Sequence, residues 1–385
     1  MFDLTKSIAA LTETISLSAP ERVVVFRYDK IGDLIVSSPL FRAIKEKQPN
    51  AYVVLVCSPY NCAVLENMPE IDLIVAYDPK AAWRDKLRFA WALRRLKPTS
   101  AFVLSPSSGG HWMGWLSGAA IRAGLILSYR RMQRFFAPML LTTYEVIDRD
   151  KLNQRPDSAQ HQSAITLRLA ARCGFPRPAV VAQSVPTTEA ARAWAARITQ
   201  TFENPQRRIL LHLGATWRGC GLSEEHLVAL AGRIHADFSD TTLLITAGPA
   251  DASYLAAMRA NFPEIVGEEP HIFASPNLYP RALLFSGLSF GVWSALIESA
   301  AVVVTPDTGA VHLASAHRRP VVAVYAPERF NAMTSLFGPW ETPCRTLRGG
   351  GGCEALTAEI LASIRALLAP PNSIVVQEKA APYRS

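Results

Sequence analysis

Asp33 stands in a turn that directly follows a short apolar run. The run 23–26 leads into Asp29-Lys30-Ile31-Gly32-Asp33, and an apolar-periodic stretch begins at Leu34. Gly32 lets the backbone turn sharply, and Asp33 then stands at the start of a helix. A carboxylate in that position either caps the helix or acts as a general base toward a cleft. Position alone leaves both roles open.

A second turn, Asp307-Thr308-Gly309, follows the apolar run 302–304 and precedes another apolar-periodic stretch. Backbone N–H groups at such a helix start, with a glycine that allows close approach, form a cradle for a diphosphate. Asp307 either caps the helix or accepts hydrogen bonds from sugar hydroxyls. We expect His312, one turn further on, to be a packed histidine and not a catalyst.

Two further turns follow apolar runs and carry polar side chains. The stretch 214–221 holds three glycines together with Thr216 and Arg218, which suit phosphate oxygens. In the stretch 247–251, Asp251 either accepts hydrogen bonds from ribose hydroxyls or caps its helix. The four glycines 349–352, in contrast, are predicted to be a flexible loop, because no strand and helix start of the required kind flank them.

These turns need a scaffold of strands and helices, and the chain shows one. Short Val-rich runs alternate with longer amphipathic runs, which is typical of buried parallel strands joined by crossover helices. We predict strands at 22–26, 52–57, 73–77, 101–105, 209–213, 243–246, 302–305 and 321–325, and helices near 34–47, 60–67, 83–96, 160–174 and 188–201.

The strand and helix pattern runs twice, with a break between the two copies. The stretch 175–187 contains Pro176, Pro178 and Pro186 and is the predicted linker. We therefore predict an α/β protein of two Rossmann-like, doubly wound parallel-sheet domains that face a central cleft. The predicted parts are a leader at 1–20, an acceptor domain at 21–180, a nucleotide-sugar domain at 188–372 and a tail at 373–385.

Composition favours a globular protein with an anionic partner. The 385 residues are 49% hydrophobic and carry a formal net charge of +8. The densest basic cluster is Arg130, Arg131 and Arg134, and no nucleic-acid-binding motif accompanies it, so nucleic acid is not the expected partner. These arginines, with Arg122, either meet phosphates of an acceptor or are solvated.

Two further features bear on the compartment. The six cysteines match neither a zinc site nor a disulfide scaffold, so we expect reduced thiols in a cytosol, with no secretory signal in residues 1–20. The stretch 282–304 has one charged residue, Glu298, but its turn-like glycines predict a turn, a buried helix and a buried strand, and not a membrane span.

The four turns, in this order, resemble the ADP-heptose:lipopolysaccharide heptosyltransferase family, glycosyltransferase family nine, from about residue 22 to 369. The most specific segments are RYDKIGDLIVSSPLFRAIKEKQPNAYVVLV and LSFGVWSALIESAAVVVTPDTGAVHLASAHRRPVVAVYAP. The resemblance implies the GT-B fold and an inverting, metal-independent transferase that needs no cofactor besides its nucleotide-sugar donor, most readily ADP-heptose. The acceptor would be a hydroxyl of a lipopolysaccharide core or related glycan.

The resemblance also assigns roles to residues. Asp33 takes the role of the base, and Asp307, Thr308 and Gly309 bind the donor, together with Thr216, Arg218 and Asp251. Gly32, Arg130 and Arg131 are placed on the acceptor side. Where the family commonly has a lysine, this chain reads Cys220-Gly221-Leu222-Ser223, and Arg218 is the nearest cation.

The expected setting is the cytoplasm, at the cytoplasmic face of the inner membrane, with the protein a monomer. Two other functions stay open. A nucleotide-sugar epimerase of the same fold would share the diphosphate cradle, and a non-catalytic nucleotide-sugar-binding protein would be consistent with the missing lysine.

Overall fold

The structure is a computed structural model that describes residues 4–13, 20–199, 207–248, 251–268, 272–273 and 281–369. The predicted tail at 373–385 lies outside these ranges, as does much of the predicted leader. The chain forms two compact units that divide between Pro186 and Thr187, within the proline-containing stretch 175–187. No helix or strand lies between Arg172 and Glu189, so the described chain is irregular at this boundary.

The first unit is built on a six-stranded sheet in the order β3-β2-β1-β4-β5-β6, with every neighbouring pair parallel. This is the strand order of a Rossmann fold, in which the chain reverses its direction of winding between β1 and β4. The strands are β1 (Arg22–Phe26), β2 (Tyr52–Cys57), β3 (Leu73–Ala76), β4 (Ser100–Val103), β5 (Ile121–Leu127) and β6 (Thr143–Ile147).

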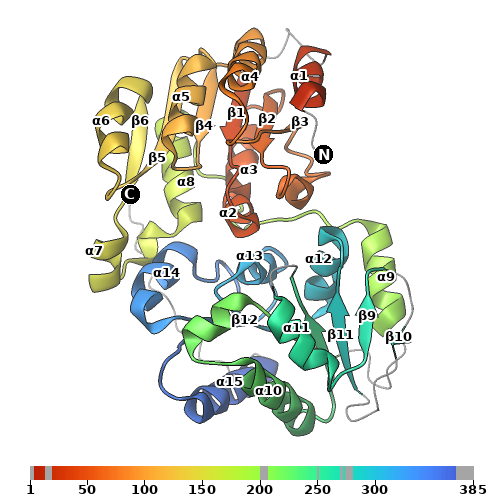
Figure 1. Ribbon diagram of the computed structural model, residues 1–385. Coiled ribbons are helices and arrows are strands. Elements are labelled where there is room, and N and C mark those ends of the chain that lie inside the picture. Colours follow the sequence, from red (N-terminus) through yellow and green to blue (C-terminus); the bar gives the residue numbers. More distant parts are fainter. Residues whose placement is uncertain are drawn as a thin grey trace. The chain divides into compact units, whose positions relative to one another are not determined.

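Helices cover both faces of this sheet. One face buries Val24, Val54 and Val103 against α1, α4 and α5, and its continuation on β5 buries Ile126 against α6. The other face carries α3 and α8, which contact each other. The bounds are α1 (Leu4–Glu13), α2 (Ile31–Val36), α3 (Ser38–Lys47), α4 (Trp83–Arg95), α5 (Ser108–Leu116), α6 (Arg131–Leu140), α7 (Arg149–Gln154) and α8 (Gln162–Arg172), with short 3-10 turns η1 (Cys62–Leu65) and η2 (Ser158–Gln160) (Figure 1).

The predicted strands of this unit and the helices predicted near 83–96 and 160–174 are confirmed, with differences elsewhere. The helix predicted near 60–67 is only the four-residue 3-10 turn η1. The helix predicted at 34–47 is two helices, because Pro39 at the start of α3 has no N–H to continue the hydrogen-bond ladder of α2. The strands β5 and β6 were not predicted. β6 is an edge strand whose side chains are only partly buried, so it lacks the continuous apolar run of a central strand.

The second unit holds an eight-stranded sheet in the order β10-β9-β11-β8-β7-β12-β13-β14, parallel except for the β9–β10 pair. Its winding reverses between β7 and β12. The strands are β7 (Arg208–His212), β8 (Thr242–Thr246), β9 (Glu264–Val266), β10 (Ile272–Phe273), β11 (Ala282–Ser286), β12 (Val302–Pro306), β13 (Val321–Tyr325) and β14 (Cys344–Arg348).

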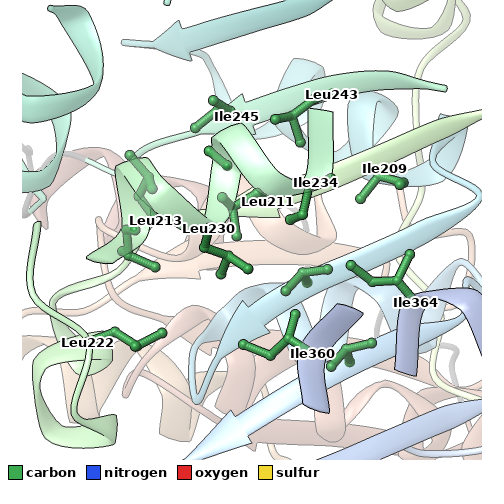
Figure 2. Close-up of a cluster of buried hydrophobic side chains, with 14 of the residues drawn as sticks. Ile209, Leu211, Leu213, Leu222, Leu230, Ile234, Leu243, Ile245, Ile360 and Ile364 are labelled. Carbon is green, nitrogen blue, oxygen red and sulfur yellow. The ribbon is translucent and has the colours of Figure 1, made fainter. Parts of the chain in front are cut away.

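One face of this sheet packs against α10, α11 and α15. Figure 2 shows Leu230 and Ile234 of α10 and Ile360 of α15 gathered around strand residues such as Leu211. The opposite face carries α12, which contacts α9 and α13. The bounds are α9 (Glu189–Thr199), α10 (Glu224–Asp237), α11 (Ala252–Arg259), α12 (Phe290–Ser299), α13 (Gly309–Ala316), α14 (Phe330–Phe337) and α15 (Cys353–Leu368), with 3-10 turns η3 (Ala215–Cys220) and η4 (Pro327–Arg329).

The second unit confirms the predicted strands near 209, 243, 302 and 321 and corrects two expectations. The stretch 282–304 begins with strand β11 and not with a turn, although the helix and strand predicted after it are present. The glycines 349–352 do lie between a strand and a helix, β14 and α15. β14 was missed because this edge strand contains Arg345 and Arg348 and is only partly buried.

Cys57 and Cys62 form a disulfide across the start of η1. The expectation that all six cysteines are reduced thiols is therefore wrong for this pair. The two cysteines are five residues apart, a spacing that did not indicate a disulfide. They come together in the structure because η1 follows directly after the end of β2.

Within the described ranges, no helix is both long and apolar enough to cross a membrane.

Candidate active site

In the first unit, the loops after β1 and β4 are joined at the point where the sheet changes winding direction. The backbone N–H of Tyr28 donates to the Ser105 hydroxyl at 2.9 Å, and the Tyr28 and Ser107 hydroxyls lie 2.7 Å apart. Ligands of doubly wound sheets bind in the crevice at such a switch point. The turn that carries Asp33 is therefore positioned where this fold places ligands.

The buried side chain of Arg27 holds the turn of Asp33 in place. Its side chain is 2% exposed and donates through Nε to the backbone oxygen of Asp33 at 2.9 Å. Nη2 lies 3.2 Å from Asp33 Oδ1, and Nη1 lies 3.2 Å from Asp29 Oδ2. Nη1 also donates to the backbone oxygen of Leu104 in the loop after β4. One buried guanidinium thus holds both carboxylates of the β1 loop and links that loop to the next.

Asp33 lies at the third position of α2. Its Oδ2 accepts the backbone N–H of Lys30 at 3.2 Å, as in a capping box, and its Oδ1 contacts Arg27. The side chain remains 20% exposed, so it is open to solvent on one side. Capping and proton transfer are therefore compatible at this position. Gly32, beside it, is buried within α2.

Asp29 is a second carboxylate that the sequence did not single out. Burial raises its pKa above the ordinary value, and Arg27 opposes that rise. The charge of Arg130 also acts to lower this pKa. Only the tertiary structure brings Arg130, which follows β5, toward residues after β1.

The two arginines predicted on the acceptor side have different surroundings. Arg130 donates to the backbone oxygen of Pro106, in the loop after β4, at 3.2 Å and lies over the ring of Tyr129. Arg131 is exposed at the start of α6. Arg130 is therefore tied to the loops of the switch point.

In the second unit, the loops after β7 and β12 meet at the corresponding switch point. The Thr216 hydroxyl donates to the backbone oxygen of Asp307 at 3.4 Å. A Cβ on Gly214 would lie 2.9 Å from Cγ2 of Thr308, so only glycine lets the two loops approach this closely. Three of the predicted donor residues, Thr216, Asp307 and Thr308, are brought together here.

Thr308 and Gly309 form the start of α13. The Thr308 hydroxyl caps the helix by accepting from the N–H of Ala310 at 3.3 Å, and it lies 2.9 Å from the hydroxyl of Thr305. The hydroxyl of Thr308, and not the Asp307 carboxylate, is thus the N-cap of this helix. His312 is buried and packs against Phe337, as expected.

Asp251 holds two loops together. Its Oδ1 accepts from the N–H of Ala215 at 2.9 Å and its Oδ2 from the N–H of Gly248 at 2.8 Å. Burial raises the pKa of this carboxyl, while both hydrogen bonds act to lower it. The carboxylate fixes the turn after β8 against the start of η3, and α11 receives no side-chain cap from it.

Arg218 and Cys220 lie close in η3 but differ in exposure. Arg218 is 69% exposed and pairs with Glu224 at the start of α10. Cys220 is 1% exposed, its thiol donates to the backbone oxygen of Val324 at 3.6 Å, and burial raises its pKa to about 12. At the position where the resemblance leads us to expect a lysine, this chain therefore has a neutral thiol packed inward.

The glycine loop 349–352 supports the same edge of the second sheet. The N–H of Gly349 donates to Tyr325 O at 2.9 Å, and the N–H of Gly350 donates to Cys220 O at 3.1 Å. A Cβ on Gly349 would lie 2.5 Å from Cys220 O. The loop therefore packs directly on η3. The role of this loop could not be predicted because strand β14, which directly precedes it, was not predicted.

Among the residues with described positions, no group of three His, Cys, Asp or Glu side chains is arranged to hold a metal ion.

Comparison with known proteins supports the same family. Residues 276–350, which include the Asp307 turn, match the model of glycosyltransferase family 9 (heptosyltransferase). A Haemophilus influenzae protein provisionally named a glycosyltransferase is 21% identical over 326 residues, which cover 80% of this chain and 83% of the relative.

Solved structures share the fold. Escherichia coli ADP-heptose lipopolysaccharide heptosyltransferase II has a TM-score of 0.66 at 17% identity, covering 90% of this chain and 98% of its own. Escherichia coli heptosyltransferase WaaC with ADP-2-deoxy-2-fluoro heptose has a TM-score of 0.62 at 16% identity, covering 89% and 99%. The UDP-GlcNAc 2-epimerase of Methanocaldococcus jannaschii follows at 0.53 and 11% identity, covering 91% and 93%.

These findings confirm two predictions, the resemblance to the family and the GT-B fold of two parallel-sheet α/β domains. They also support the prediction that the chain is a glycosyltransferase.

Proposed function

Proceeding from a chain with the GT-B fold and a match to glycosyltransferase family 9, we propose that this protein is an inverting, metal-independent glycosyltransferase. It transfers heptose from ADP-heptose to a hydroxyl of a lipopolysaccharide core or related glycan. It works as a monomer in the cytoplasm, at the inner face of the membrane. The compartment follows from the family resemblance and not from the cysteines, since two of them form a disulfide.

The observation that carries this proposal is the junction of the loops after β7 and β12. Thr216 donates to the backbone of Asp307, and Gly214 lets Thr308 approach. The helix start at Thr308 and Gly309 offers backbone N–H groups to a diphosphate. The solved structure of WaaC, which contains ADP-2-deoxy-2-fluoro heptose, supports an ADP-linked donor for this protein.

The proposed reaction needs a proton acceptor on the first unit. Asp33 removes the proton of the acceptor hydroxyl as its oxygen forms a bond to C1 of the sugar. The bond from C1 to the diphosphate oxygen breaks on the opposite face, so the configuration at C1 inverts. Arg27 keeps the carboxylate oriented, and the proton stays on Asp33 until solvent takes it.

Negative charge on the departing ADP is stabilised by fixed backbone dipoles and by a fixed cation. The N–H groups at the start of α13 and the guanidinium of Arg218 are the groups that would meet it. Preorganised donors of this kind need no metal ion. Arg218 supplies the cation that the family's lysine would provide, because the Cys220 thiol is buried and neutral.

The direct test is turnover by the purified protein against a panel of nucleotide-sugars, ADP-heptose first, with a lipopolysaccharide-core acceptor. We expect a product with inverted configuration at C1 and a rate that a chelator leaves unchanged. Failure of every donor to be transferred or hydrolysed would leave a non-catalytic binding protein, the alternative that the buried Cys220 favours.

Asp33 can be tested apart from its capping role. Asp33→Asn keeps an oxygen that accepts the Lys30 N–H but cannot take a proton. We expect kcat to fall by about 10²- to 10⁴-fold for both Asp33→Asn and Asp33→Ala, with donor affinity near that of the wild type. Turnover within a few-fold of wild type in the Asn variant would reject Asp33 as the base.

The epimerase alternative has one observation in its favour, the shared fold of the UDP-GlcNAc 2-epimerase at a TM-score of 0.53. It needs no acceptor. Incubation of each nucleotide-sugar without acceptor, followed by separation of sugar isomers, distinguishes the two functions, because only an epimerase forms an isomer of the intact donor.

A further inference from the structure

The outer surface of the helical layer α1, α4, α5 and α6 exposes an unusual set of side chains. These helices cover one face of the first sheet, and their inward residues form its core (Figure 1). Large apolar side chains nevertheless point outward from three of them. The exposed members are Trp83, Leu87 and Trp91 of α4, Trp112 and Trp115 of α5, and Met132, Phe135 and Met139 of α6.

The spacing shows that each helix has an apolar stripe on its outer side. In α4, Trp83, Leu87 and Trp91 recur at every fourth position, next to the buried Phe89 and Leu93. In α5, Trp112 and Trp115 alternate with the buried His111 and Met113. An amphipathic helix that packs on a sheet normally turns polar residues outward. These helices therefore have an inner apolar face that the core uses and an outer one that it does not.

The aromatic side chains of α5 and α6 form one continuous cluster. The ring centroids of Trp112 and Trp115 lie 5.7 Å apart, and those of Trp112 and Phe136 lie 6.2 Å apart. Phe135 and Phe136 are in contact at 5.1 Å. Phe135 is 70% exposed, Trp91 67% and Trp83 66%, so most of their surface meets solvent. The cluster on α5 and α6 is contiguous exposed apolar surface, which marks an interaction site. The exposed tryptophans of α4 lie on the neighbouring helix of the same layer.

The charged side chains of these helices indicate which kind of partner this surface binds. The helices α4, α5 and α6 carry Asp85 as their one carboxylate, and it faces Arg88 at 3.5 Å. Against it stand seven basic residues, Arg84, Lys86, Arg88, Arg94, Arg95, Arg131 and Arg134. Arg84 lies over the ring of Trp83 at 5.6 Å. The surface thus combines tryptophan, phenylalanine and methionine with arginine and has almost no negative charge.

That combination matches a lipid interface better than other partners. Trp and Arg side chains are both suited to the headgroup region, since each has an apolar body and a polar end. Basic residues near an anionic leaflet gain electrostatic binding energy, and apolar side chains add burial in the acyl boundary. Aromatic, Met and Arg side chains are also enriched at protein interfaces, but basic residues spread over two helices with a single carboxylate favour a partner whose whole surface is anionic.

We propose that the outer face of α4, α5 and α6 is a docking surface for an anionic lipid bilayer. The first unit lies with its aromatic stripes in the headgroup region and its arginines on the lipid phosphates. The contact is peripheral. It deepens the proposed location at the inner face of the membrane, on which the choice of a bilayer rests, by naming the surface that makes the contact. Its test uses a surface apart from the turn of Asp33 and needs neither donor nor acceptor.

The test is flotation of the purified full-length protein with vesicles of phosphatidylcholine alone or with phosphatidylglycerol, without nucleotide-sugar. We expect binding to the anionic vesicles only, decreasing with salt. Trp112→Ser with Phe135→Ser should lower the partition coefficient by about tenfold or more, and Arg84→Glu with Arg134→Glu by at least as much.

Matched control variants distinguish binding through this surface from nonspecific adsorption to the vesicles. Tyr60→Ser removes an aromatic side chain that is 65% exposed in the loop after β2. Arg149→Glu with Arg155→Glu reverses two exposed charges at α7, outside the layer. Both controls should bind anionic vesicles as the wild type does. Thermal melts and circular dichroism should show that every variant is folded.

Three results would overturn the proposal. The first is that the wild-type protein does not bind anionic vesicles. The second is that the aromatic variants bind these vesicles as tightly as the wild type does. Sedimentation that shows the wild type to self-associate through this surface, with the aromatic variants monomeric, would assign the surface to a second copy of the chain. Hydrolysis of a soluble nucleotide-sugar, measured in parallel, reports on the proposed enzyme function independently.

Discussion

At the scale of single residues, Arg27 is the group on which the first site depends. It is buried, and three parts of its guanidinium contact Asp33 O, Asp33 Oδ1 and Asp29 Oδ2. A buried guanidinium is stabilised only while its carboxylate partners and hydrogen bonds are in place. A lysine keeps the charge but cannot form this planar fork.

We therefore expect Arg27→Lys to lower kcat by roughly 10- to 100-fold, because the Asp33 carboxylate loses its orientation. The KM for the donor should be unchanged, since the donor residues lie on the second unit. Arg42→Lys is the control, because Arg42 also donates to backbone oxygens, those of Val180 and Ala182, away from the turn. Equal losses of kcat in both variants would assign Arg27 a structural role only.

Arg218 is the second residue with a specific prediction. If it meets the diphosphate, Arg218→Ala should raise the Kd for the nucleotide-sugar by about tenfold, the size expected for one charged hydrogen bond. Arg207→Ala is matched to it, because Arg207 is also an exposed arginine in an ion pair, with Asp240, but precedes β7. Calorimetric titration of both variants with the donor decides the point, and an unchanged Kd for Arg218→Ala would reject its role.

At the scale of elements, the loops at the carboxyl ends of strands are fitted to one another by small residues. Gly214 admits Thr308, and Gly349 admits the backbone of Cys220. Both close approaches lie at the edge of the second sheet where its parallel strands end. The two edge strands β6 and β14 escaped prediction because their side chains are only partly buried, yet β14 positions the glycine loop.

Gly349→Ala tests this fit. Its Cβ would lie 2.5 Å from Cys220 O, a backbone atom that cannot move aside cheaply. We expect a loss of about 1–3 kcal/mol in stability, as for overpacked sites, together with weaker donor binding. Gly351→Ala is the control, since a Cβ there meets no atom within 4 Å. Chemical denaturation of the two variants should differ, and equal stability would contradict the fit.

At the scale of the whole molecule, two buried histidines should make the fold less stable as the pH falls below 6.5. Burial lowers the pKa of His212 to about 4, from an ordinary value of 6.5, and lowers that of His317 similarly. Between these values the unfolded chain binds protons that the folded chain does not, so stability falls as pH drops from 6.5 to about 4.

His212→Asn should flatten this dependence by about 1–3 kcal/mol while keeping an acceptor or donor near the Thr246 hydroxyl, 3.0 Å from His212 Nδ1. His226→Asn is the control, because His226 Nδ1 makes a similar local contact with Ser223 but lies at the start of α10. Unfolding free energies measured from pH 7 to 4 should separate the variants. An unchanged slope for His212→Asn would show that other groups set the acid limit.

The sequence alone determined the features that depend on local pattern. Central strands such as β1, β2 and β13 were predictable because they are continuous apolar runs buried on both faces. The turns of Asp33 and Asp307 were found because glycine and polar residues interrupt those runs at strand ends. The family match rested on the same two segments, and the match to residues 276–350 includes the second.

The tertiary structure decided what depends on residues distant in the chain. Nothing in the sequence near Arg27 predicts that it links two carboxylates. That role depends on its burial beneath the loops after β1 and β4. Gly349 acquired a function only when β14 placed it against Cys220. The outward tryptophans of α4 and α5 look like ordinary core residues in sequence, since periodicity gives the presence of an apolar face and not the side that the sheet covers.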